Sequence, residues 1–248
     1  MWQLKNRVFR LLDQLKQIRK RIILDYRVHS KPKVVSIQGI KVSLTEDMSG
    51  RLVEALYSGA YEKYELELVK SQLHPSDIVM ELGTGLGLVS IYCAKRIGSE
   101  RVFTYEANPE LEPIIRHNYA MNQVAPTLTI CMLGDKLGEQ KFYVRKNFWA
   151  SSTIPRSPND KAIKVHVKSF NQEVKRINPT FLIIDIEGGE YELLKDAELH
   201  NVQTIVMELH KSFIGYEKAE VVISRLTETG FRVNQELSYN EELLLQRN

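Results

Sequence analysis

The chain has 248 residues, of which 43% are hydrophobic and 26% are charged, and its formal net charge is +3. These values are typical of a globular protein and exclude a disordered chain, a collagen and a disulfide-rich scaffold. The two cysteines, Cys93 and Cys131, each lie in an apolar run without a partner at metal-ligand spacing, so neither a disulfide framework nor a zinc ribbon is predicted.

Basic residues are concentrated at the start of the chain. Residues 1–33 contain ten Lys or Arg against two Asp, a balance of +8, which leaves −5 for the remainder of a chain whose total is +3. The mildly acidic remainder makes nucleic acid an unlikely main substrate. Charged residues interrupt any signal-peptide core, and no apolar run approaches the roughly 18 residues that cross a bilayer. We therefore expect a cytoplasmic protein.

Residues 2–25 are predicted to form one basic amphipathic helix. Its apolar stripe repeats at alternating steps of four and three residues, while Lys and Arg occupy the opposite face. The members of the stripe are Leu4, Val8, Leu11, Leu15, Ile18 and Ile22. Two placements stay open. The stripe packs on the body or on a second subunit of a homo-oligomer, or the helix lies on a membrane surface and makes the protein peripheral.

Three segments are predicted: the basic helix (1–33), a hairpin and helical extension (34–76) and a main domain (77–248). In the extension, β-rich runs flank Gln38-Gly39, which indicates a hairpin, and residues 47–73 are helical with a break near Ser58-Gly59. In the main domain, strand-like runs alternate with helical runs. The strand-like runs are 77–82, 101–107, 127–133, 139–146, 164–170, 181–187, 203–210, 231–237 and 241–246. This alternation predicts an α/β fold with a doubly wound, mostly parallel sheet and helices on both faces.

A glycine-rich turn follows the first strand of the main domain. The sequence ELGTGLG places Gly83, Gly85 and Gly87 where a strand crosses to a helix, and small residues there let the backbone approach a ligand. Position 88 is Leu, where the nicotinamide fingerprint needs Gly, and no Lys-Ser or Lys-Thr follows. Neither that fingerprint nor a P-loop is therefore present.

Acidic residues follow the next two strands. Glu106 ends the second strand, and a carboxylate at that position can accept hydrogen bonds from both ribose hydroxyls of a nucleoside. Gly134-Asp135 follows the third strand, where Asp135 is placed to accept from an adenine amino group. Together with the glycine turn, these residues predict a nucleoside cofactor.

Five stretches of the chain resemble the FkbM-type S-adenosylmethionine-dependent methyltransferases. They are VMELGTGLGLVSIYCAKRIG, VFTYEANPELEPIIRHNYAMN, LGDKLGEQKFY, FLIIDIEGGEYELL and IVMELH. The glycine turn is shared by class I methyltransferases, whereas DIEGGE followed by a strand ending in E-x-H is more specific to this family. Two features depart from the family pattern: Asn171 stands where Asp is usual, and the N-terminal basic helix is not a family feature.

The resemblance implies a Rossmann-like class I methyltransferase sheet, S-adenosylmethionine as cofactor, and O-methylation of hydroxyls, often of glycans or natural products. The acceptor is then a small molecule or a glycan. The residues expected to contact the cofactor are Glu81, Gly83, Thr84, Gly85, Gly87, Glu106, Ala107, Asn108, Gly134, Asp135 and Asp185.

Four titratable residues are predicted to converge at the carboxyl edge of the sheet. Asp185 and Glu187 follow one buried strand, and Glu208 and His210 end the next. An alcohol is a poor nucleophile and needs a base, so His210 is the candidate base, oriented by Asp185 or Glu208. The same oxygen-rich set could instead hold a divalent ion such as Mg or Mn. We favour the base over the metal.

Two other functions stay open from the sequence. One is N-methylation of a protein; adenine methylation is disfavoured because Asp185-Ile186-Glu187-Gly188 replaces the Asn/Asp-Pro-Pro-aromatic loop that this reaction uses. The other is a non-catalytic cofactor-binding module that assembles through its N-terminal helix.

Overall fold

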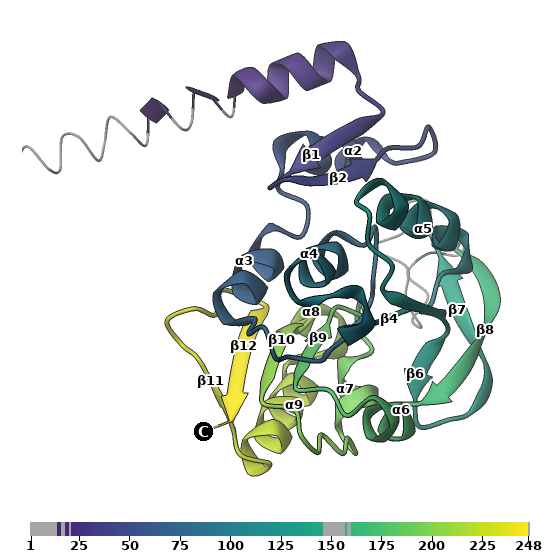
Figure 1. Cartoon of the computed structure of the whole chain (residues 1–248). Helices are drawn as coiled ribbons and strands as arrows, with labels where there is room; N and C mark the ends of the chain where they lie inside the picture. The colour runs from purple at the N-terminus through teal and green to yellow at the C-terminus, as the bar shows by residue number, and fades with distance from the viewer. Residues whose placement is uncertain (1–13, 16–17, 20, 146–156, 158–159, 248) are drawn as a thin grey trace, which may run out of the picture. The chain divides into compact units, whose positions relative to one another are not determined.

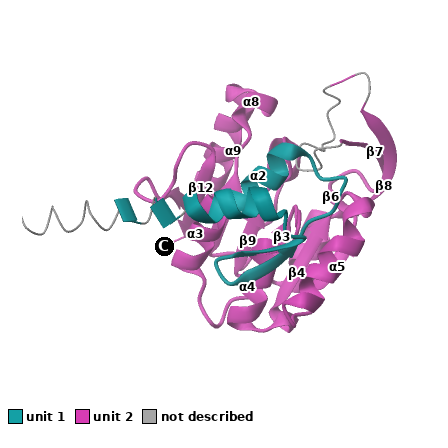
Figure 2. Cartoon of the chain, turned by 90° about the horizontal axis from the view of Figure 1, so that it is seen from above, with its two compact units in different colours: residues 1–61 teal, residues 62–248 magenta. Residues whose placement is uncertain are grey.

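A computed structural model describes residues 14–15, 18–19, 21–145, 157 and 160–247 (Figure 1). The chain divides into two compact units, residues 1–61 and residues 62–248 (Figure 2). The first unit holds both the N-terminal helix and the hairpin, and the second begins just before helix α3 (Lys63–Gln72). The two units do not coincide with the three segments predicted from the sequence. The boundaries of those three segments stay a prediction.

The first unit contains the N-terminal helix, the hairpin and one further helix. Every described residue between 14 and 30 is helical, which extends the predicted helix to Ser30; residues 2–13 of that prediction lie outside the described residues. Strands β1 (Val34–Ile37) and β2 (Ile40–Ser43) pair antiparallel as predicted. Gln38 and Gly39 both have positive φ, 50° and 88°, as a two-residue turn that matches the strand twist requires. Helix α2 (Gly50–Ser58) ends at the predicted break.

The second unit is built on a seven-stranded sheet, and its strand order confirms the predicted fold class. The order is β11-β12-β10-β9-β3-β4-β5; the five strands from β10 to β5 run parallel, and β12 runs antiparallel to both of its neighbours. The strands are β3 (Val79–Leu82), β4 (Val102–Glu106), β5 (Thr127–Ile130), β9 (Phe181–Ile184), β10 (Thr204–Glu208), β11 (Phe231–Val233) and β12 (Glu242–Arg247). This is the predicted doubly wound, mostly parallel sheet.

Helices cover both faces of this sheet (Figure 1). Apolar residues of α6, α7 and α9 form one core with the inner strands, whereas α3, α4 and α5 lie outside that core. The helices are α3 (Lys63–Gln72), α4 (Leu88–Ile97), α5 (Glu112–Met121), α6 (Phe170–Ile177), α7 (Glu190–Leu194), α8 (Lys211–Ile214) and α9 (Tyr216–Glu228), with 3-10 turns at Ser99–Arg101 and Pro109–Leu111. Among the described residues, every helix is too short or too polar to traverse a bilayer.

A second, smaller sheet corrects one prediction. The run 127–133 was expected to be a single strand, but it is broken at Cys131 into β5 and β6 (Met132–Gly134). β6 leaves the main sheet and pairs with β8 (Lys161–Ser169), which in turn pairs with β7 (Gly138–Val144). The predicted edge strand over 139–146 is β7, at the border of this sheet. The amide of Cys131 still donates to the carbonyl of Glu106, 2.9 Å away, and ties the break to β4.

Candidate active site

The strand order reverses between β3 and β9, and ligands of doubly wound folds bind beyond the carboxyl ends of the strands at such a point. Gly83 follows β3 and Asp185 follows β9 there. Gly83 has φ of 89°, and a Cβ added to it would lie 1.7 Å from the backbone oxygen of Asp185. Any side chain at position 83 would therefore push the two strand ends apart. The glycine is needed for this close approach as well as for its φ.

Glu106 is buried at the end of β4, beside the glycine turn. Its Oε2 accepts from the amide of Gly85 at 3.1 Å, and its Oε1 accepts from the amide of Asn108 at 2.8 Å. Burial raises the pKa of Glu106 to about 7, although the backbone amides that donate to it oppose this shift. The turn and the acid predicted to bind a nucleoside are thus brought together, with the carboxylate held in one orientation.

Other predicted cofactor residues surround this turn. Glu81 is buried in β3; burial raises its pKa to about 8, and its Oε2 has no hydrogen-bond partner among the described residues. The Thr84 hydroxyl donates to the carbonyl of Tyr105 at 3.3 Å. A Cβ on Gly87 would lie 2.8 Å from the Tyr119 ring.

The remaining predicted cofactor residues are less closely tied to the turn. Ala107 and Asn108 directly follow Glu106, and the Asn108 side chain caps the 3-10 turn that precedes α5. Gly134 ends β6 in the smaller sheet, and Asp135 after it is exposed. The contact of Asp135 with adenine stays a prediction.

His210 is held by a carboxylate that the sequence interpretation missed. It follows β10, is buried, and its Nδ1 lies 2.8 Å from Oε1 of Glu190. Glu190 is fully buried, and the same Oε1 also accepts from the amide of Gly188 at 2.9 Å. A carboxylate accepts hydrogen bonds, so Nδ1 carries the proton and Nε2 points away from Glu190. The His210 ring stacks on Phe213, with centroids 5.4 Å apart.

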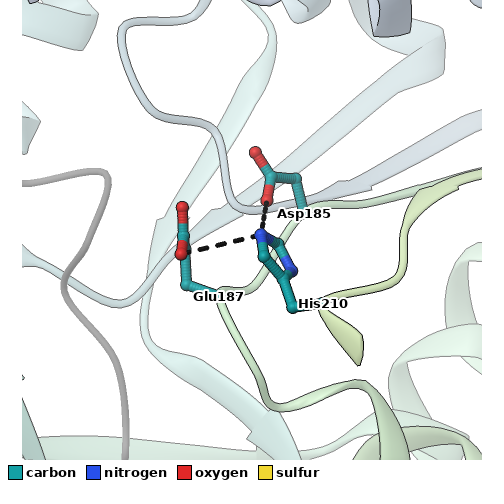
Figure 3. Close-up of side chains that lie close together, drawn as sticks. All are labelled: Asp185, Glu187 and His210. Atoms are coloured by element: carbon teal, nitrogen blue, oxygen red, sulfur yellow. Dashed lines mark ion pairs between the residues drawn. The ribbon is translucent and has the colours of Figure 1, made fainter. Parts of the chain in front are cut away.

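Nε2 of His210 faces the three acids predicted to converge with it. It lies 3.6 Å from Oε2 of Glu187, 3.6 Å from Oε1 of Glu208 and 3.9 Å from Oδ1 of Asp185. Figure 3 shows Asp185 and Glu187 on either side of the imidazole edge that carries Nε2. The expected convergence of all four groups is therefore observed, but the residue that orients the ring is Glu190 rather than Asp185 or Glu208.

The acids and the imidazole strongly shift one another's ionisation. Burial and the charges of neighbouring acids together raise the pKa of Asp185 and of Glu208 to about 7, although the charge of His210 lowers both. For His210, burial lowers the pKa, but the hydrogen bond to Glu190 and the charges of the surrounding acids outweigh it and raise the value to about 10. This pKa is higher than the near-neutral value expected from the residue type alone. In the donor-free protein the imidazole is therefore protonated at neutral pH.

A second acid that sequence reasoning missed lies in α3. Burial raises the pKa of Glu65 well above its ordinary value, and the charges of nearby acids, Asp185 and Glu81 among them, raise it further. Glu65 lies in α3, before β3 and the glycine turn in the chain, and it belongs to no motif. Its position near these acids could therefore not be predicted from the sequence. The raised pKa favours the uncharged acid, so Glu65 brings a buried carboxyl group, not a negative charge, close to Asp185 and Glu81.

Asn171, the departure from the family pattern, has a structural role. Its Nδ2 donates to the carbonyl of Asp196 at 3.1 Å, and its Oδ1 accepts from the amide of Glu198 at 2.9 Å. The helix cap of α6 is supplied by Ser169, whose hydroxyl accepts from the amide of Gln172. Asn171 therefore ties α6 to the segment before β10, and the amide group serves this purpose through both of its polar atoms.

Residues 83–233 match the methyltransferase FkbM domain family, which is more than half of the chain. The chain belongs to this family. The match begins at the glycine turn and includes the DIEGGE segment, the ends of β9 and β10, and His210.

The individual proteins that are similar to this FkbM-family chain share little sequence with it. The UPF0246 protein MYPE6270 of Malacoplasma penetrans is 26% identical over 133 residues, which are 46% of this chain and 47% of that protein, so the match spans about half of each. A tRNA (uracil-54, C5)-methyltransferase of Pyrococcus abyssi is 12% identical, with a TM-score of 0.48 over 87% of this chain and 43% of the other. The ribosomal protein L11 methylase of Lactobacillus delbrueckii is 13% identical, with a TM-score of 0.45 over 77% and 80%.

The residues present fit the cofactor of the family. The fixed carboxylate of Glu106 and the unpartnered Oε2 of Glu81 both lie around the β3–α4 turn. A sulfonium and an ammonium group are both cationic, and a bound cation would favour the ionised form of the buried acids Glu81 and Glu106. Glu106 would hold the ribose, and Glu81 is placed for the cationic part.

Replacing Glu106 by alanine should weaken donor binding at least tenfold, about 1.4 kcal/mol, because charge-assisted hydrogen bonds to the ribose are lost. Titration calorimetry with S-adenosylmethionine measures this affinity. Glu110→Ala is the matched control, since Glu110 is an exposed acid four residues further along the chain. A folded Glu106→Ala protein with wild-type affinity would remove Glu106 from the cofactor site.

The donor-free protein should become less stable as the pH rises from about 5 to about 9. The pKa values of Asp185 and Glu208, about 7, exceed those of the unfolded chain, so folding takes up protons and stability falls as pH rises toward the folded values. His210 acts in the same direction: its contribution is complete below its ordinary pKa of 6.5 and is lost as pH approaches about 10.

Thermal unfolding followed across this pH range measures the effect. Glu81→Gln mimics a protonated Glu81 and should flatten the profile between the ordinary pKa of 4.5 and the folded value of about 8. A melting temperature that rises with pH over the same interval would contradict the assignment of raised pKa values to these acids.

Proposed function

We propose that this methyltransferase acts on a hydroxyl of a glycan or small metabolite, with His210 as the base that removes the hydroxyl proton. The observation that carries the proposal is the buried Glu190–His210 hydrogen bond of 2.8 Å, which turns Nε2 toward the acids at the strand ends beside the glycine turn. A neutral amine is nucleophilic without such help. An alcohol needs a base within hydrogen-bond reach.

Each residue of the site has a distinct part in this proposal. Glu190 keeps the proton on Nδ1, so that only Nε2 can accept the proton of the acceptor hydroxyl. Asp185, Glu187 and Glu208 stabilise the imidazolium that forms when Nε2 takes up this proton. The bound cofactor supplies a methyl group on a positively charged sulfur, and holding acceptor and donor in line supplies much of the rate.

The raised pKa of His210 has to fall for the base to work near neutral pH. Its value of about 10 arises from the hydrogen bond to Glu190 and the charges of the surrounding acids. The positive charges of a bound cofactor offset that negative charge, and the pKa of the imidazole then moves toward neutral. Nuclear magnetic resonance of the His210 ring, titrated with and without S-adenosylmethionine, measures this shift directly.

The acceptor class is tested with methyl-labelled donor and parallel sets of sugars, small alcohols, peptides and lysine-rich protein. Transfer to hydroxyl acceptors supports the proposal. Transfer only to lysine would make the chain a protein N-methyltransferase, and donor binding without transfer to any acceptor would support a non-catalytic module.

A divalent ion is the second candidate for activating the hydroxyl. Ligand atoms of Asp185, Glu187 and His210 all lie within 4.8 Å of one another, and the buried Glu190 on Nδ1 resembles the carboxylate that often supports a metal-binding histidine (Figure 3). Activity that disappears with a chelator and returns with added Mn or Mg would favour the ion over the base.

A further inference from the structure

The N-terminal helix exposes its apolar stripe. In the described part of the helix, Leu15, Ile18, Ile22 and Tyr26 recur at steps of three and four residues, and all four are exposed, Ile22 by 63% and Tyr26 by 70%. Residues at this spacing lie on one face of a helix. The described members of the stripe, Leu15, Ile18 and Ile22, are therefore exposed on the first unit, and Tyr26 continues their face.

The same helix is attached to its own unit by a different face. Arg27 donates to the carbonyl of Tyr57 at 2.7 Å and to that of Ser36 at 2.9 Å, which joins the helix to α2 and to β1. Leu24 and Arg27 are partly buried, whereas their neighbours along the helix are exposed. At 100° per residue, Leu24 lies about 160° from Ile22 around the helix axis. The stripe thus points away from the rest of the unit.

Charge argues against a second copy of the helix as the partner of this stripe. In the seven-residue repeat that places Leu15 and Ile22 at position a, the charged residues at the flanking e and g positions are all basic. They are Lys5, Arg7, Arg19 and Arg21. Two such helices would bring like charges together in either orientation. Asp25 also occupies the core position that follows Ile18 in the repeat.

We propose that this helix binds an anionic phospholipid surface, with the stripe of Leu15, Ile18, Ile22 and Tyr26 inserted among the lipid chains and the flanking basic residues over the headgroups. The excess of ten Lys or Arg over two Asp in residues 1–33 matches a negative surface. An apolar stripe with Lys and Arg beside it is the pattern of helices that lie in the membrane interface. The proposal is independent of the acceptor proposed above.

Flotation of the full-length protein with lipid vesicles tests the proposal. The protein is expected to float with vesicles of phosphatidylcholine and phosphatidylglycerol in equal parts, to stay behind with phosphatidylcholine alone, and to be released by high salt. An Ile18→Asp/Ile22→Asp double variant should bind the anionic vesicles at least about tenfold more weakly, because two apolar side chains no longer enter the lipid. An Arg19→Glu/Arg21→Glu variant should weaken binding as well.

Val221→Asp is the matched control, since Val221 is an apolar residue exposed by 47% on α9. It should float like the wild type. Three results would overturn the proposal: no flotation of the wild type, equal flotation of the Ile18→Asp/Ile22→Asp variant, or a wild-type dimer that this variant converts to a monomer. A melting temperature lowered by many degrees in that variant would show that the stripe packs within the protein and would overturn it too.

Discussion

Replacing His210 by alanine should lower turnover by roughly 10²–10⁴-fold while donor affinity stays nearly unchanged. The imidazole is the group whose Nε2 faces the strand-end acids, and it makes no contact with Glu106 or the glycine turn among the described interactions. His200→Ala is the matched control, because that histidine is largely exposed and pairs only with Glu198 among the described ion pairs. Donor affinity is measured by calorimetry and turnover with labelled donor.

The pH profile separates a base from a merely structural histidine. The wild-type rate should rise with pH as the imidazolium of the donor complex loses its proton, and this limb should vanish in His210→Ala. Glu190→Gln keeps an acceptor for Nδ1 but removes a charge that raises the pKa of His210, so its limb should move to lower pH. Near-normal turnover of His210→Ala would move the role of base to Asp185 and Glu187.

Gly83→Ala is the second change with a large expected effect. The new Cβ would lie 1.7 Å from the Asp185 carbonyl oxygen, which is backbone and cannot rotate aside. The ends of β3 and β9 must separate, and this displaces the turn that holds Glu106 and the segment that carries Asp185 and Glu187. We expect donor affinity to fall at least about a hundredfold, since the cofactor site is assembled at this junction.

Gly230→Ala isolates the steric part of this effect. Gly230 has φ of 97°, close to the 89° of Gly83, but a Cβ on it would meet nothing within 4 Å. This control therefore carries the cost of positive φ, about 1 kcal/mol, without the collision. Equal melting temperatures and donor affinities for the two variants would show that the junction between β3 and β9 can open freely.

The doubly wound fold follows from the sequence because its strands are short apolar runs with strong breaks between them. The break at Cys131 was not predictable in this way: Thr127 to Leu133 is one continuous apolar run, and only pairing with β8 draws its second half into another sheet. The start of helix α6 was also not predicted, because the strand-like run 164–170 continues into its first residue. Phe170 was counted into the preceding strand, although Ser169 caps the helix that begins there.

The candidate site was predictable as far as strand ends determine it. His210 and its three facing acids lie at or just after the ends of the parallel neighbours β9 and β10, so their convergence is a consequence of topology. Glu190 stands past two glycines in a turn, and only the positive φ values of Glu187 and Gly188, 53° and 99°, bring the chain back so that Glu190 reaches Nδ1. Backbone reversals of this kind are not visible in residue type.

The left-handed backbone conformation of Glu187 lowers the stability of the fold at a residue whose carboxylate faces His210. A residue with a side chain at φ of 53° costs of order 1 kcal/mol, and this carboxylate also stands close to other acids. Glu187→Gly would remove both costs but also the attraction of this carboxylate for protonated His210, 3.6 Å away, so a screen for heat-resistant variants should select it above the pH at which His210 loses its charge. The same variant loses one of the carboxylates that face Nε2. Thermostability gained at this position would therefore come at the expense of methyl transfer, and engineering should leave it unchanged.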